Sequence, residues 1–268
     1  MNAPDSLIIT HNAGFFSCCT IRLFKIIEYF NTYKVLPKTV NSEEQFNFYK
    51  NKTRNDITSN YFDMTAEQSI EFEDTITLTS DTSELQFSNY RNINFGKVKP
   101  FIEKYFSLSS TILTLIEKIK EQYSLDYRNL CSVYYRGTDK SRETNIGNFD
   151  EYIMKAEMIK MNNPTIEFLL MTDEPKYINI FKRRFPSTVV VSEVDTSDRF
   201  IHSLYLLAAV SIISKTKYII CGSGNVSNWI MFYRGNADNV YQYLNHKEYI
   251  YNVLNTHYDP LKRDFWLV

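Results

Sequence analysis

The clearest pattern in the chain is an alternation of short apolar runs and longer amphipathic stretches in its second half. Runs of strand length alternate with stretches of helical spacing, which is the order of a parallel α/β sheet. We predict strands at 130–135, 165–171, 188–194, 217–221 and 239–243, with helices at 149–161, 176–184, 200–214 and 226–233. In such a doubly wound sheet, the loops that follow the strands lie along one edge, where ligands bind.

The first 125 residues carry a weaker pattern. Between 41 and 94 the sequence is polar and rich in aromatic residues, and only 75–80 alternates as a strand does. Elsewhere we predict strands at 7–10 and 35–40 and helices at 18–31, 99–106 and 109–123, the last capped by Ser109. We therefore expect two lobes, at 1–125 and 126–245, and a C-terminal helix and tail at 246–268 that crosses back to the first lobe.

Composition narrows the class of protein. The chain has 268 residues, 44% of them hydrophobic, so it can form sizeable cores. Its net charge of -1 disfavours nucleic acid as a partner, and no apolar stretch is long enough for a membrane span. Four cysteines without disulfide or zinc spacing, and a start without a secretory signal, lead us to expect a cytoplasmic protein.

A loop of mixed charge directly follows the predicted strand at 130–135. It contains Arg136, Gly137, Thr138, Asp139 and Lys140. An arginine fork, a lysine and a flexible glycine suit a diphosphate whose charge rises as it leaves. Glu143 could accept a proton from an acceptor hydroxyl, or pair with Arg142. The alternative is a solvated loop whose charges neutralise one another.

A second candidate loop follows the strand at 217–221. It contains Gly222, Ser223, Gly224 and Asn225 and leads into a helix, so its amides and the helix dipole could face an anion. The pattern lacks the third glycine of a dinucleotide fingerprint and lies late in the chain. A tight turn that only redirects the chain is the alternative.

Two further positions carry polar groups at predicted strand ends. Asp173 could bind a ribose or order a loop, while Thr172 or Asp173 could equally cap the helix that begins at Pro175. The loop after the first strand contains His11, Asn12, Gly14, Phe15 and Ser17, which could contact substrate. A single histidine is more often structural, and no set of histidines and carboxylates has metal spacing.

The segment from Tyr134 to Lys140 resembles the His-x-Arg-x-Thr-Asp-Lys motif of the fucosyltransferase superfamily with the GT-B fold. This superfamily includes α1,6-, nodulation and protein O-fucosyltransferases. Residues 170–175 and 217–225 resemble two later motifs of the family in the same order and spacing. The Gly-Phe-Phe-Ser loop and residues 229–236 are also similar to compact glycosyltransferases of large algal viruses.

This resemblance implies a GT-B fold, with two Rossmann-like lobes and a donor cleft between them. Arg136 would hold the β-phosphate with help from Lys140, Gly224 and Asn225 would contact phosphate, and Asp173 would lie near the nucleoside. The catalytic glutamate of the family aligns nearer Thr144 than Glu143, which leaves the general base open. Enzymes that use GDP-fucose hold guanine with an aspartate where this chain has Ala208, Ala209 and Val210, so UDP-xylose rivals GDP-fucose as donor.

We therefore expect an inverting, metal-independent glycosyltransferase without cofactor that moves fucose or xylose from its nucleotide sugar to a hydroxyl of a glycan. Its location would be the cytoplasm, that of the host cell if the protein is viral. Two alternatives stay open at this point. One is a non-catalytic nucleotide- or sugar-binding protein of the same fold, and the other is a Rossmann-type reductase.

Overall fold

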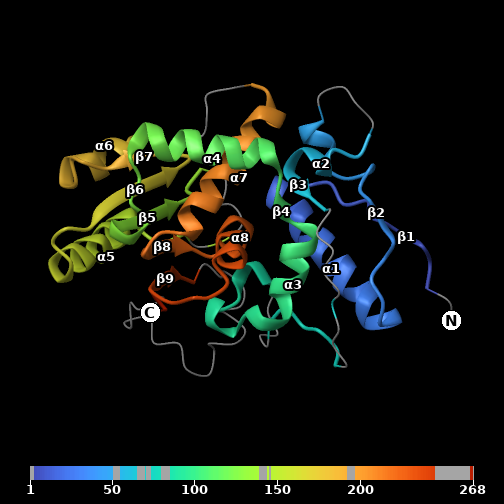
Figure 1. Ribbon diagram of the computed structural model, residues 1–268. Helices are drawn as coiled ribbons and strands as arrows, with labels where there is room; N and C mark the ends of the chain where they lie inside the picture. Colours follow the sequence, from blue (N-terminus) through green and yellow to red (C-terminus); the bar gives the residue numbers. More distant parts are fainter. Residues whose placement is uncertain are drawn as a thin grey trace. The chain divides into compact units, whose positions relative to one another are not determined.

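The computed structural model describes residues 3–50, 55–64, 70, 74–79, 85–138, 144, 146–191, 197–244 and 266–267. The chain divides into two compact units, each built from three stretches of sequence (Figure 1). Unit 1 comprises Met1–Ser80, Asn94–Lys118 and Val194–Ala208. Unit 2 comprises Asp81–Ile93, Ile119–Glu193 and Ala209–Val268. The lobe boundaries expected from the sequence stay a prediction.

Unit 2 contains a six-stranded sheet in the order β10-β9-β8-β5-β6-β7. Its strands are β5 (Leu130–Tyr135), β6 (Glu167–Thr172), β7 (Val189–Val190), β8 (Tyr218–Gly222), β9 (Val240–Tyr243) and β10 (Trp266–Leu267). Neighbouring strands are parallel except β10, which pairs antiparallel with β9. The predicted α/β class with a parallel sheet is therefore confirmed. The pattern missed β10, and β7 is shorter than predicted.

Four helices connect these strands: α5 (Phe149–Asn162), α6 (Pro175–Arg184), α7 (Arg199–Ser214) and α8 (Asn225–Arg234). The chain steps from β5 through β6 to β7 in one direction, then returns to β8 and continues to β9 in the other. Because such crossovers are right-handed, α5 and α6 cover one face, and α7 and α8 cover the other. The order reverses between β5 and β8, so the switch point of the sheet lies there.

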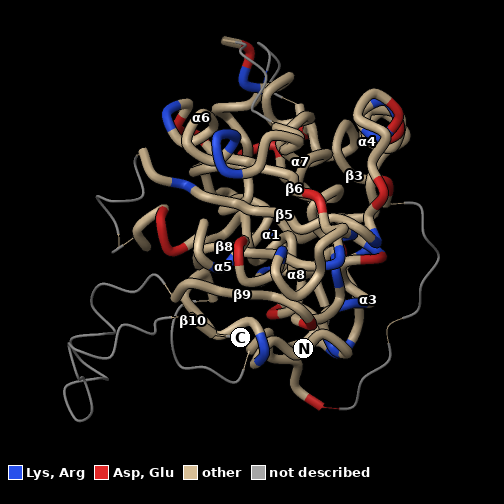
Figure 2. Tube along the Cα trace, turned by 90° about the vertical axis from the view of Figure 1, so that its left-hand side faces the viewer, with Lys and Arg blue, Asp and Glu red and all other residues tan. Residues whose placement is uncertain are grey.

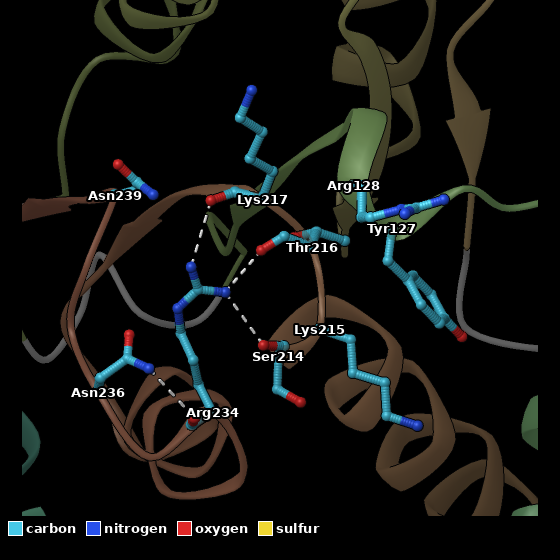
Figure 3. A pocket seen from close by; sticks show the side chains of 9 residues that line it. All are labelled: Tyr127, Arg128, Ser214, Lys215, Thr216, Lys217, Arg234, Asn236 and Asn239. Atoms are coloured by element: carbon cyan, nitrogen blue, oxygen red, sulfur yellow. Dashed lines mark hydrogen bonds between the residues drawn. The ribbon is translucent and has the colours of Figure 1, made fainter.

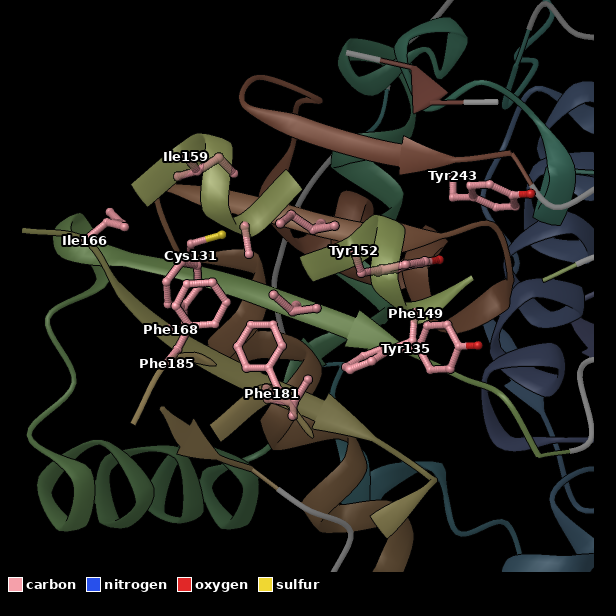
Figure 4. Close-up of a cluster of buried hydrophobic side chains, with 14 of the residues drawn as sticks. Cys131, Tyr135, Phe149, Tyr152, Ile159, Ile166, Phe168, Phe181, Phe185 and Tyr243 are labelled. Carbon is pink, nitrogen blue, oxygen red and sulfur yellow. The ribbon is translucent and has the colours of Figure 1, made fainter. Parts of the chain in front are cut away.

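The core of unit 2 explains why β5 reads as a continuous apolar run. All six residues of β5 are buried, because helices cover both faces of the sheet. Figure 4 shows Cys131 and Tyr135 of β5 in a cluster with aromatic side chains of α5 and α6, among them Phe149 and Phe181. Burial of each such side chain contributes about 1.5–3 kcal/mol. Figure 2 shows no charged residue on β5, β8 or β9.

Unit 1 has shorter strands and smaller sheets than unit 2, and it is rich in contacts between aromatic rings. Its strands pair in twos, β1 (Ser6–Ile8) with β2 (Thr39–Asn41), and β3 (Phe62–Asp63) with β4 (Ser107–Leu108). Its helices are α1 (Phe15–Tyr33), α2 (Thr58–Tyr61) and α3 (Phe95–Tyr105), while α4 (Ser110–Tyr123) and α7 each belong partly to both units. Short 3-10 helices are η1 (Asn47–Tyr49), η2 (Leu85–Phe87), η3 (Tyr90–Asn92) and η4 (Tyr127–Asn129), the first in unit 1 and the others in unit 2.

In the first half of the chain, the structure confirms one predicted detail and contradicts another. The cap at Ser109 is confirmed, since its Oγ accepts a hydrogen bond from the amide of Ile112 at 3.4 Å. The strand predicted at 75–80 is wrong for the described residues 74–79, in which only Thr79 forms an isolated bridge. Ile76 is buried and its amide and carbonyl both bond to the side chain of Asn31, which takes the place of a strand partner. The helix predicted from 246 lies outside the described residues.

Candidate functional site at the carboxyl edge of the sheet

Three of the predicted polar loops meet at one edge of the sheet in unit 2. Arg136 follows β5, Asp173 follows β6, and Gly222 ends β8. The register pairs Tyr135 with Thr172, and Tyr134 with Cys221, so these three strands end side by side. The Arg136 loop and the turn at Gly222 therefore flank the switch point, where ligands bind in open α/β sheets.

The carboxylate of Asp173 holds the Arg136 loop. It accepts hydrogen bonds from the amide of Gly137 at 2.9 Å, the hydroxyl of Thr138 at 2.5 Å and the amide of Thr138 at 3.4 Å. Nε of Arg136 lies 4.0 Å from the same carboxylate. Asp173 could order a loop or cap a helix, and in the structure it orders the loop.

The capping role considered for Thr172 and Asp173 is wrong in its detail. The residue that caps α6 is Glu174, which makes no side-chain capping bond, and Pro175 begins the helix as predicted. Thr172 instead accepts a hydrogen bond from the amide of Glu174 at 3.2 Å through its Oγ1. The hydroxyl of Thr172 thus satisfies the amide that follows the end of β6. The carboxylate of Asp173 is therefore available to bind the neighbouring loop.

Arg136 lies at the surface of this edge rather than in the core. Its side chain is 42% exposed, whereas that of Asp173 is 15% exposed. Most acceptor sites of the carboxylate are directed at Gly137 and Thr138, and its 4.0 Å separation from Arg136 is at the limit of an ion pair. A guanidinium in this position can form a bidentate pair with a phosphate at the strand end.

The absence of a side chain at Gly137 lets the carboxylate of Glu174 approach the loop closely. A Cβ atom at this residue would lie 2.1 Å from Oε1 of Glu174 and 3.0 Å from the ring of Tyr135. Glu174 also forms an ion pair with Lys176 at 2.6 Å. Glu174 lies in the segment 170–175 that resembles a family motif, and the structure places its carboxylate against the Arg136 loop.

The turn after β8 uses two of its amides inside the protein. The amide of Ser223 donates to the carbonyl of Tyr243 at 2.9 Å, and that of Gly224 donates to the hydroxyl of Tyr90 at 3.2 Å. Gly224 precedes α8 with φ 155° and ψ 168°, a conformation that glycine adopts most readily. The turn therefore has a structural role, and the start of α8, which has no side-chain cap, is the part that could face an anion.

Tyr90 belongs to a segment that sequence reasoning did not connect with the site. Its hydroxyl also donates to the carbonyl of Gly222 at 3.4 Å, and its amide donates to the side chain of Gln242 at 3.0 Å. Gln242 in turn donates to Ser223 Oγ and to the carbonyl of Ser88, each at 2.9 Å. Burial raises the pKa of Tyr90 well above its ordinary value, so its hydroxyl keeps its proton. No local pattern signals the contacts of Ser88 and Tyr90, which join residues more than 130 positions apart.

Several predicted site residues lie outside the described part of the chain or away from this edge. Asp139, Lys140 and Glu143 are not described. Thr144, where the resemblance places the catalytic glutamate, is buried, and its Oγ1 has no hydrogen-bond partner among the described residues. In α8, Asn225 donates to the side chain of Gln86 at 3.4 Å.

The segment 11–17 belongs to unit 1, and the loop predicted here is shorter than expected because Phe15, Phe16 and Ser17 already form the first turn of α1. Nε2 of His11 lies 3.1 Å from Oγ of Ser17, and Asn12 accepts a hydrogen bond from the amide of Asn47 at 2.9 Å. Gly14 precedes α1, and Phe15 is buried among aromatic rings. These rings are Phe16, Phe46, Tyr49 and Tyr61. Phe15 thus serves the core of unit 1, while His11 and Ser17 are half-buried.

The described residues contain neither a membrane-spanning helix nor a cluster of metal ligands. None of their helices combines the length and apolarity needed to cross a bilayer. Nor do they contain a cluster of three or more histidine, cysteine, aspartate or glutamate side chains that could hold a metal ion.

Comparison with solved structures finds partial likenesses to NodZ fucosyltransferases. A NodZ α1,6-fucosyltransferase soaked with GDP-fucose matches with TM-score 0.43 and 12% identity, over 57% of this chain and 50% of that chain. The same enzyme co-crystallised with GDP matches with TM-score 0.39 and 15% identity, over 50% and 45%. NodZ from Bradyrhizobium matches with TM-score 0.36 and 13% identity, over 50% and 45%.

This chain therefore aligns with half or less of the NodZ structures. No protein-family model matches it, and no curated protein does. Because the TM-scores are below 0.5, we base the proposed function on the residues of the sheet edge.

Proposed function

We propose that the protein is a glycosyltransferase with a GT-B-like fold that transfers a sugar from a nucleotide diphosphate to a hydroxyl of a glycan. The observation that carries this proposal is the position of Arg136, which is half-exposed at the switch point of a parallel sheet, on a loop held by Asp173. A ready-made guanidinium at this point suits a diphosphate better than an uncharged ligand.

The proposed reaction requires few chemical steps. The acceptor oxygen attacks the anomeric carbon, the bond from that carbon to the diphosphate breaks, and the diphosphate leaves with an added negative charge. Arg136 offsets this charge, and Lys140 is expected to assist it. Because these side chains supply the positive charge, we expect no metal requirement. Glu143 is the candidate for the base that accepts the hydroxyl proton.

The donor remains a choice between UDP-xylose and GDP-fucose. Ala208, Ala209 and Val210 lie within α7 and are buried, with at most 3% exposure. These side chains offer no carboxylate to a guanine base, which favours a UDP-sugar. Thermal unfolding with UDP and with GDP tests this preference, because a ligand at 100 times its Kd stabilises a protein by about 2.7 kcal/mol.

Replacement of Arg136 tests the proposed function itself. Sugar transfer or donor hydrolysis is measured with both donors for the wild type, Arg136→Ala and the control Arg183→Ala. Arg183 is an exposed arginine near the end of α6, so its loss removes the same charge. We expect Arg136→Ala to lower kcat/KM more than tenfold, which corresponds to about 1.4 kcal/mol of transition-state stabilisation.

Two results would contradict this assignment. If Arg136→Ala keeps more than about a tenth of the wild-type kcat/KM, the arginine does not carry the leaving group. If the wild type binds UDP or GDP but neither transfers nor hydrolyses any donor, the protein is a nucleotide-binding relative without catalysis. EDTA added to the same assays tests the expected independence from metal.

A further inference from the structure

A second feature of unit 2 lies at the opposite edge of its sheet. A pocket of about 590 Å³ is lined by residues of η4, the turn between α7 and β8, the end of α8 and the turn before β9. These segments precede the strands β5, β8 and β9, whereas Arg136 follows β5. Six strand residues separate the two edges, which corresponds to roughly 20 Å. The pocket is therefore separate from the proposed donor site.

The lining of this pocket has one sign of charge. Arg128, Lys215, Lys217 and Arg234 are among its nine lining residues, and no acidic residue is. The remaining residues are a tyrosine and hydroxyl- or amide-bearing residues such as Thr216 and Asn236. In a chain whose net charge is -1, four cations around one pocket form a local positive field that favours anions.

Cations often gather here because the helices between parallel strands end at this edge, and their C-terminal carbonyls attract positive charge. Arg234 supplies positive charge to such carbonyls. Its guanidinium donates to the carbonyl of Ser214 at 3.1 Å, at the end of α7, and to those of Thr216 at 2.6 Å and Lys217 at 3.2 Å, just after it. Figure 3 shows Arg234 turned toward these carbonyls, while the side chains of Lys215, Lys217 and Arg128 extend away from it. The other three cations are thus not needed to neutralise this helix end.

Among the described residues, each of these three cations has only weak partners. Lys215 lies over the ring of Tyr127 with 5.8 Å from Nζ to the ring centroid. Lys217 donates to the neutral side chain of Asn163 at 3.4 Å, and its Nζ lies 5.3 Å from the centroid of the Tyr218 ring. Arg128 is 95% exposed and lies 3.8 Å from a carboxylate oxygen of Asp126, an ion pair that contributes little in water. All three are exposed, so their charge acts mainly on a ligand at the pocket mouth.

We propose that this amino-edge pocket binds a small molecule through a phosphate or diphosphate group. Lys215, Lys217 and Arg128 would neutralise the anion, and the side-chain amides of Asn236 and Asn239 would donate hydrogen bonds to its oxygens. The volume lies within the range of pockets that hold small ligands. The site does not depend on the proposed glycosyltransferase activity, since it shares no residue with the carboxyl edge.

The experiment is calorimetric titration of the full chain with inorganic pyrophosphate. Four proteins are compared: the wild type, Arg136→Ala, the double variant Lys215→Ala/Lys217→Ala and the control double variant Lys182→Ala/Arg183→Ala. The control removes the same two charges from exposed positions of α6. We expect Arg136→Ala and the control to keep a pyrophosphate site that Lys215→Ala/Lys217→Ala weakens at least tenfold. Arg128→Ala should weaken it as well, and circular dichroism verifies that each variant is folded.

The outcomes separate the two edges of the sheet. If Lys215→Ala/Lys217→Ala binds pyrophosphate as the wild type does, the proposal is overturned. It is equally overturned if Arg136→Ala abolishes all binding, because the only phosphate site is then the donor site. Sedimentation with phosphatidylserine vesicles forms a third arm. Vesicle binding without pyrophosphate binding would assign the cations to a membrane surface and contradict a small-molecule pocket.

Discussion

The two loops at the carboxyl edge of unit 2 are held in opposite ways. The Arg136 loop is fixed by one carboxylate, Asp173, which is partly exposed and accepts three hydrogen bonds. The turn at Gly222–Asn225 is fixed by buried neutral groups, chiefly the hydroxyl of Tyr90 and the amide of Gln242. The carboxylate fixes the backbone at Gly137 and Thr138 and leaves the side chain of Arg136 partly exposed to a ligand. A neutral buried anchor suits a turn whose main task is to support its neighbour.

The largest expected effect follows loss of the charged anchor. Asp173→Ala removes the acceptor of three hydrogen bonds, so we expect unfolding in urea to become easier by about 3 kcal/mol. Affinity for UDP or GDP should fall at least tenfold, because Arg136 loses its support. Asp173→Asn should recover part of both losses, since one amide oxygen can still accept from Gly137. A stability change below about 0.5 kcal/mol would show that the carboxylate does not hold the loop.

A smaller effect is expected at the neutral anchor. Tyr90→Phe removes one buried hydroxyl and leaves the amide of Gly224 unpaired, which should cost about 2 kcal/mol of stability. Urea unfolding measures this loss, with Tyr123→Phe as an exposed control that should change by less than about 0.5 kcal/mol. Nucleotide affinity should be nearly unchanged. The contrast between the two loops fails if Tyr90→Phe reduces affinity more than Asp173→Ala does.

The last effect is absent at neutral pH and concerns the neutral anchor under alkaline conditions. Burial raises the pKa of Cys221, which adjoins the turn, from 9.0 to about 12. The unfolded chain therefore ionises first, and stability is full below pH 9 and falls as pH rises toward 12. We expect Cys221→Ala to reduce the slope of the unfolding free energy against pH by about 1.4 kcal/mol per unit in this range. Urea midpoints between pH 8 and 10.5 measure it, and an unchanged slope would exclude Cys221 as the source.

Much of unit 2 could be predicted because its signals are local. β5 spans the predicted residues, since helices on both faces make every position of the strand apolar. Helix α5 begins at the predicted residue, where Asn148 accepts a hydrogen bond from the amide of Asp150. The position of Arg136 and Asp173 at neighbouring strand ends followed from the same alternation.

The remaining features could not be predicted because they depend on contacts between distant residues. The local sequence is equally compatible with two roles for Asp173, capping of a helix and ordering of a loop. Only the pairing of β5 with β6 decides between them. The alternation of apolar and polar residues around Ile76 reflects burial of the Ile76 side chain, not a strand. The backbone amide and carbonyl of Ile76 bond to the side chain of Asn31 instead of to another strand. The antiparallel strand β10 is two residues long and too short to leave a pattern.

The contact of Ser88 with Gln242, 154 residues apart, has a consequence for synthesis of the chain. On the ribosome, the segment that contains Tyr90 emerges long before β8 and β9, so it must wait for its partners without a place to pack. Closing so long a separation is slow relative to formation of local helices. A chaperone that shields the aromatic residues near Tyr90 during translation should therefore raise the yield of native protein more than one that acts after release.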